Sequence, residues 1–77
     1  MPTILIEGYK FRFYAQDPDE PPHMHVLRGE DDAKEWLYPV ELECAYGYNS
    51  REVNRILDLT RQHQDELLEA WYGYFGR

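Results

Sequence analysis

The sequence predicts an α+β fold in which an antiparallel sheet of about four to five strands packs against one long C-terminal helix. Short segments of alternating apolar and polar residues, separated by turns that contain glycine or proline, fill residues 3–48. A stripe of apolar residues at helical spacing then runs from Ser50 to about Tyr72. Strands followed by a single helix favour two layers, with the helix on one face of the sheet. At 77 residues the chain has about the size of one domain, so we expect a single domain over residues 1–77.

The first two strands are predicted to form a hairpin. Residues 3–6 and 9–15 are β-prone and are separated by Glu7-Gly8, where glycine can adopt the positive φ of a tight turn. Side chains alternate between the two faces of a strand. The second strand therefore has an aromatic inner face and a polar outer face, formed by Tyr9, Phe11 and Phe13 against Lys10, Arg12 and Tyr14.

Three more extended segments follow a breaker that holds three prolines, residues 16–22. They cover residues 23–28, 33–38 and 40–44, with a polar turn at residues 29–32 and a bend or sheet edge at Pro39, and residues 46–48 close the sheet region. In the segment 23–28 either the histidines or Met24 and Val26 face the helix. Hydrophobicity favours Met24 and Val26 as the inner pair.

The helix has a clear start. Asn49 is a favourable N-cap, and Glu52 lies three residues later, at the spacing of a capping box. Glycine at position 73 or 76 can terminate the helix. One face is predicted to be apolar or uncharged, formed by Val53, Ile56, Leu57, Thr60, Gln64, Leu67, Leu68 and Trp71.

Composition and charge exclude several classes of protein. Twelve aromatic residues and 43% hydrophobic residues are not typical of a disordered chain, and no apolar run approaches the roughly 20 residues of a membrane span. The 15 acids and 8 bases give a net charge of −7, which makes nucleic acid an unlikely partner. The one basic cluster that could oppose this view is on the helix, at Arg51, Arg55 and Arg61.

Cysteine use and the start of the chain predict a cytoplasmic protein. A lone Cys44 excludes an intrachain disulfide and is typical of a reducing compartment. The apolar run at residues 4–6 is too short for a signal peptide, and no basic residue precedes it.

The three histidines are candidate metal ligands. His23 and His25 form a His-x-His pair that shares one face of a strand, and His63 lies at the flank of the apolar stripe on the helix. If they converge, they could hold a divalent metal ion that activates water, as in a metal-binding protein or a small hydrolase or nuclease. The alternative, hydrogen-bonded or surface histidines, has more weight because a metal site usually has a denser ligand set. Residues point to no other cofactor and leave open whether the protein is an enzyme.

The carboxyl end offers candidate partner-binding residues. Trp71, Tyr72, Tyr74 and Phe75 crowd the last turns, and exposed tyrosine and tryptophan are favoured in protein interfaces. The alternative is that these rings fill a small core. A homo-oligomer is also left open.

Two motifs carry a resemblance to a known family. The segments Asp-Glu-Pro-Pro-His-Met-His-Val at 19–26 and His-Gln-Asp-Glu-Leu-Leu-Glu-Ala-Trp at 63–71 occur in order. With the start Met-Pro-Thr-Ile, the chain resembles the mostly bacterial family of domain of unknown function 4160 over nearly its whole length. The signature histidines of that family correspond to His23, His25 and His63.

The resemblance also implies a partner. Members of this family are often encoded beside another small protein, in an arrangement like a toxin–antitoxin pair. We therefore expect a small protein-binding module, one component of a toxin–antitoxin-like pair, ahead of the metal-binding or hydrolase alternative.

Overall fold

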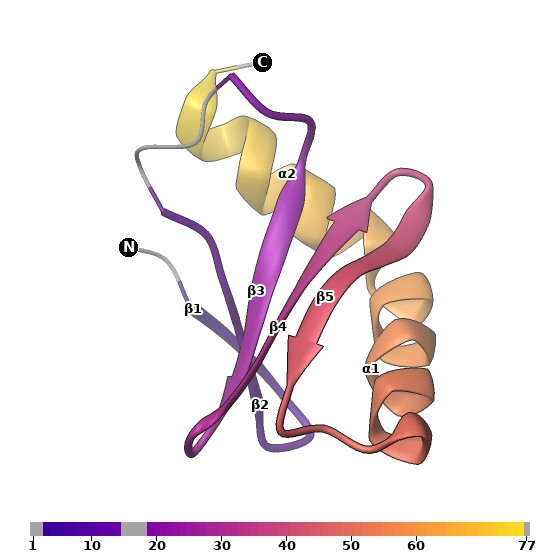
Figure 1. The fold of residues 1–77 in the computed structure, drawn as a ribbon. Coiled ribbons are helices and arrows are strands. Elements are labelled where there is room, and N and C mark those ends of the chain that lie inside the picture. The colour runs from indigo at the N-terminus through magenta and orange to yellow at the C-terminus, as the bar shows by residue number, and fades with distance from the viewer. Residues whose placement is uncertain (1–2, 15–18, 77) are drawn as a thin grey trace.

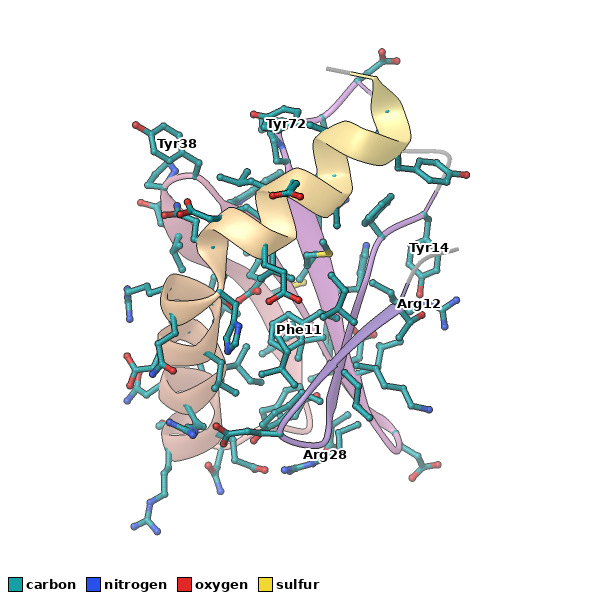
Figure 2. The ribbon with its side chains drawn as sticks, turned by 180° about the vertical axis from the view of Figure 1, so that it is seen from behind. Phe11, Arg12, Tyr14, Arg28, Tyr38 and Tyr72 are labelled. Atoms are coloured by element: carbon teal, nitrogen blue, oxygen red, sulfur yellow. The ribbon has the colours of Figure 1, made fainter. Side chains whose placement is uncertain are left out.

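The computed structural model describes residues 3–14 and 19–76 and has an α+β architecture with a five-stranded sheet and two helices (Figure 1). Each strand pairs antiparallel with its neighbour along the chain, in the order β1-β2-β3-β4-β5. Both helices lie against the same side of the sheet (Figures 1 and 2). The elements are β1 (Thr3–Ile6), β2 (Tyr9–Arg12), β3 (His23–Arg28), β4 (Asp31–Leu37), β5 (Val40–Tyr46), α1 (Ser50–Gln62) and α2 (Gln64–Phe75).

The predicted hairpin and its alternation are confirmed. Ile6 pairs with Tyr9 across a two-residue turn in which Glu7 and Gly8 have φ of 50° and 86°. Two successive positive φ values match the right-handed twist of a hairpin. The aromatic inner face is buried, as the alternation predicts, although β2 ends at Arg12 rather than at the predicted residue 15, which lies outside the described residues.

The core lies between the helices and one face of the sheet. Met24 and Val26 are the inner pair of β3, as hydrophobicity predicts, and they stand opposite Glu35 and Ala33 of β4. The polar turn after β3 is shorter than predicted because β4 already begins at Asp31. The fully buried apolar side chains of this core include Phe11, Met24, Val26, Ala33, Leu37, Ile56, Leu59 and Leu67.

The prediction of one long helix is wrong, because the helical segment is broken at His63, whose φ and ψ are −111° and 18°. A straight helix over residues 50–75 would be about 39 Å long at 1.5 Å per residue, whereas the longest dimension of the molecule is 34 Å. The bend directs α2 across the end of the sheet, where the side chain of Gln64 donates to the carbonyl of Leu37 at 2.7 Å. Leu67 and Trp71 are thereby buried against the strands.

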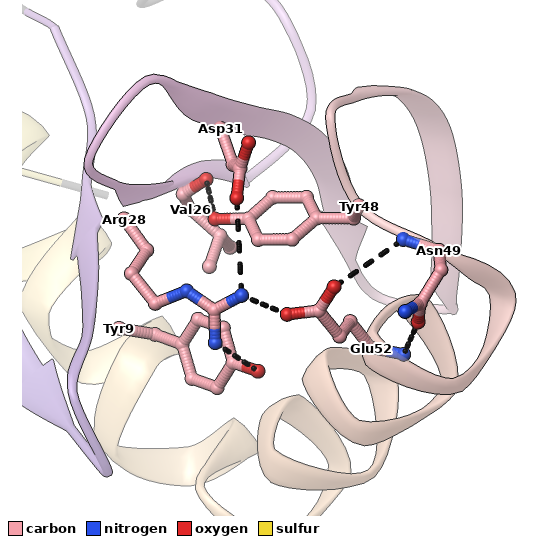
Figure 3. A network of polar contacts seen from close by, with 7 residues as sticks. All are labelled: Tyr9, Val26, Arg28, Asp31, Tyr48, Asn49 and Glu52. Carbon is pink, nitrogen blue, oxygen red and sulfur yellow. Dashed lines mark hydrogen bonds and ion pairs between the residues drawn. The ribbon is translucent and has the colours of Figure 1, made fainter.

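The amino end of α1 is held by the predicted capping box. The Asn49 side chain accepts from the backbone N–H of Glu52 at 2.8 Å, and the Glu52 carboxylate accepts from the backbone N–H of Asn49 at 3.4 Å. The same carboxylate pairs with Arg28 at the end of β3, and Arg28 also donates to the Tyr9 hydroxyl at 3.2 Å (Figure 3). These contacts join the helix start to the sheet.

Next to this network the Tyr48 hydroxyl donates to the carbonyl of Val26 at 3.0 Å (Figure 3). Burial raises the pKa of Tyr48 to about 12. The hydroxyl therefore keeps its proton and its donor role at neutral pH.

Replacing Asn49 with Ala is expected to lower the free energy of unfolding by about 1 kcal/mol, since alanine removes the side-chain oxygen that accepts from the backbone N–H of Glu52. Urea denaturation followed by circular dichroism measures the change. Asn54→Ala, at an exposed position of the same helix, is the matched control and should leave stability unchanged or slightly raised. An equal effect of both substitutions would show that the cap does not contribute.

Candidate functional site

His23 is a buried residue that joins the sheet to α2. It is fully buried at the start of β3, and its ring lies 5.6 Å from the Trp36 ring and 4.9 Å from the Trp71 ring. Its Nδ1 is 3.0 Å from the carbonyl oxygen of Pro21, which can only accept, so Nδ1 carries a proton and donates. The first histidine of the His-x-His pair therefore has packing and hydrogen-bonding partners inside the fold.

His25 lies beside His23 but on a more open part of the same sheet face. The two imidazole centroids are 5.6 Å apart, and the Tyr14 ring lies 4.8 Å from His25. On the flanking strands Arg12 and Lys34 stand directly opposite His25. The second histidine therefore has a basic residue opposite it on each flanking strand and aromatic rings beside it.

His63 lies at the junction of the two helices. Its Nδ1 is 3.2 Å from the carboxylate of Glu66, in the first turn of α2. Within residues 3–14 and 19–76, no three histidine, cysteine or acidic side chains are grouped in a way that could hold a metal ion. The metal site at His23, His25 and His63, and the hydrolase built on it, stay predictions that no grouping of these side chains supports.

The aromatic residues at the carboxyl end divide between core and surface. Trp71 is 2% exposed and its ring lies 5.2 Å from Phe13 and 4.4 Å from Phe75, which is itself only partly exposed. Tyr72 and Tyr74 are 42% and 48% exposed. Of the four predicted partner-binding residues, Trp71 is a core residue, and the two tyrosines offer most surface to a partner.

Two tyrosines outside the predicted partner-binding set are more exposed still. Tyr38, in the turn between β4 and β5, is 74% exposed, and Tyr46 at the end of β5 is 66% exposed. Tyr38 and Tyr72 lie at the same end of the molecule (Figure 2). The signal for Tyr38 was its place before Pro39, since a proline in a strand pattern marks a turn or an edge.

Sequence reasoning missed a buried acid. Glu35 of β4 is fully buried, and burial raises its pKa to about 8, against the smaller opposing effects of the Thr60 hydrogen bond and Arg61. The Thr60 hydroxyl lies 2.5 Å from Glu35 Oε2 and 2.8 Å from the carbonyl of Ile56.

Because the Thr60 hydroxyl has one proton, it donates to only one of these two acceptors at a time, and donation to Glu35 favours the ionised carboxylate, which is why this bond opposes the rise in pKa. The burial of Glu35 could have been predicted from the sequence, because Glu35 has the same strand phase as the buried Ala33 and Leu37.

Comparison with known proteins gives a family. The family model described as Domain of unknown function (DUF4160) matches residues 8–72. No curated protein and no solved structure matches the chain. Neither α1 nor α2 is long and apolar enough to cross a membrane, a result that covers the described residues.

Proposed function

This chain belongs to the DUF4160 family, and we propose that it acts as a protein-binding module, one component of a toxin–antitoxin-like pair. The observation that carries the proposal is the surplus of exposed rings. Phe11, Phe13 and Trp71 fill the core, while four tyrosines stay between 42% and 74% exposed. Tyrosine is enriched at protein interfaces because its ring buries a large area while its hydroxyl stays hydrogen-bonded.

The exposed edge strand β5 suggests how a partner would bind, by adding a strand to the sheet. Strand β5 has seven residues, pairs only with β4 in the described sheet, and exposes Tyr46 and Leu42. An edge strand of this length can accept an extended partner segment through backbone hydrogen bonds. Tyr38, in the preceding turn, lies at the start of the same edge.

The charge of β5 indicates which kind of partner strand could pair with this edge. Glu41 and Glu43 are exposed on β5, so a second copy of this edge would place acids against acids, which destabilises a strand pair. A partner strand with lysine or arginine at the facing positions would instead be favoured. The proposed partner is therefore a different protein with a basic extended segment.

Purification of the tagged protein from its native host tests the proposal. We expect one stoichiometric partner, and we expect the double variant Tyr38→Ser/Tyr46→Ser to bind it at least tenfold more weakly, since each tyrosine that anchors an interface contributes more than about 1 kcal/mol. Leu5→Ser is the matched control, because Leu5 is an equally exposed apolar residue on the opposite edge strand. Purification without a partner, or equal binding by both variants, would contradict the proposal.

A further inference from the structure

Three basic side chains form a row across the sheet face opposite the core. Arg12 of β2 stands opposite His25 of β3, and His25 stands opposite Lys34 of β4. Directly opposed basic residues do not stabilise a sheet. Lys34 is paired with Glu20, and in a chain with a net charge of −7 a row of three basic residues is a local departure from the average charge.

Aromatic rings lie beside this row. His23 stands opposite Trp36 of β4, and Tyr14, two residues beyond the end of β2, has its ring 4.8 Å from that of His25. The Arg12 guanidinium carbon is 5.4 Å from the Tyr14 ring centroid, and Lys34 Nζ is 5.0 Å from that of Trp36. Figure 2 shows Arg12 and Tyr14 side by side at the edge of the molecule away from α1.

Arg12 also carries an unused donor. Its Nε is buried and has no hydrogen-bond partner among the described residues. A buried donor without an acceptor costs about 1–3 kcal/mol, so an incoming acceptor that reorients the guanidinium would regain this energy. The arginine fork matches the oxygens of a phosphate, as it does those of a carboxylate.

From these observations we propose that this sheet face binds single-stranded nucleic acid, with phosphates on the row Arg12–His25–Lys34 and bases against Tyr14 and Trp36. Single-strand binding surfaces combine these two elements, a basic track for the backbone and aromatic rings on which bases stack. The net charge makes nucleic acid an unlikely partner, but it is a sum over the whole chain and does not describe the local charge of this row. It uses neither Tyr38 nor Tyr46 and is therefore independent of the protein-binding proposal.

Neighbouring acids limit the affinity. Glu20 Oε1 lies 2.8 Å from Lys34 Nζ, so a phosphate must compete with this ion pair. Exposed pairs of this kind contribute only about 0.2–1 kcal/mol, so displacement is feasible. We expect weak binding that depends strongly on salt.

Fluorescence anisotropy with a labelled oligouridine of ten nucleotides tests the proposal on the full chain. For two contacted phosphates, a fourfold rise in salt should weaken binding about sevenfold. Arg12→Gln and Lys34→Gln should each weaken binding about fivefold or more and reduce the salt dependence. Tyr14→Leu, which removes the stacking ring, should weaken binding by at least about fivefold with the salt dependence unchanged.

Arg61→Gln is the matched control, since it removes the same charge from an exposed position on α1 and should stay within twofold of the wild type. Circular dichroism of each variant shows whether it is folded, and Lys34→Gln keeps the test valid if Arg12→Gln does not fold. No binding by the wild type at about 1 mM protein and low salt would overturn the proposal. So would equal loss with Arg61→Gln, or equal binding of a duplex of the same length, since a duplex cannot stack its bases on the rings.

Discussion

Replacing Glu35 with Gln is expected to remove a fall in stability that the wild type shows between about pH 4.5 and pH 8. Burial raises the pKa of this carboxyl from 4.5 to about 8, so the folded chain holds the proton over a pH range in which the unfolded chain releases it. The stabilising contribution is complete below pH 4.5 and is lost as pH rises to about 8, by about 1.4 kcal/mol per pH unit and on the order of 5 kcal/mol in all. The amide that replaces the carboxyl in the Glu35→Gln variant has no such proton to lose.

Urea denaturation at pH 4.5, 6, 7.5 and 9 measures this effect as the difference between wild type and Glu35→Gln. That difference isolates Glu35 from the other titrating groups. Glu41→Gln, at an exposed position of β5, is the control and should follow the wild type across the series. A difference between wild type and Glu35→Gln that does not change with pH would show that the carboxyl is ionised in the folded protein.

Replacing Trp71 with Ala is expected to destabilise the protein by about 3–5 kcal/mol, because deletion of a buried indole removes its packing and leaves a cavity. Trp71 contacts His23, Phe13 and Phe75, and it is the main ring through which α2 packs against the start of β3. A loss of this size approaches the whole stability of a small protein, so much of the variant should be unfolded at 37 °C.

Thermal unfolding followed by circular dichroism measures the loss. Tyr72→Ala, one residue along the same helix but exposed, is the control and should change the free energy of unfolding by less than about 1 kcal/mol. A loss below 1 kcal/mol for Trp71→Ala would mean that α2 does not depend on this contact.

Local patterns predicted most of the elements because their causes are local. The alternation of Tyr9 and Phe11 with polar neighbours gave β2 its inner face, and Asn49 with Glu52 gave the start of α1. Both depend on residues within four positions of each other. These are the features on which a single sequence is most informative.

The break between the helices has a cause that is not local. No glycine or proline lies near His63, and Thr60, Gln64 and Leu67 keep helical spacing through it. The bend follows from the size of the sheet and from the burial of Leu67 and Trp71 against it. The periodicity of the sequence predicts neither the size of the sheet nor which helical residues pack against it.

The candidate sites depend on strand register in the same way. His23 and His25 were visible as a pair, but the neighbours that define their chemistry, Arg12 and Lys34, come from other strands. A shift of one residue would move each side chain to the other face. The row Arg12–His25–Lys34 could therefore not be predicted before the strand pairing was known. The burial of Glu35, in contrast, could have been predicted from its phase in β4.

Amide hydrogen exchange of β5 in the purified complex tests the proposed binding function most directly. If a partner strand pairs with this edge, amides within Val40–Tyr46 should exchange at least tenfold more slowly in the complex than in the free protein, while those of β1 on the opposite edge should not change. Unchanged exchange in β5 when the protein is saturated with its partner would contradict the account.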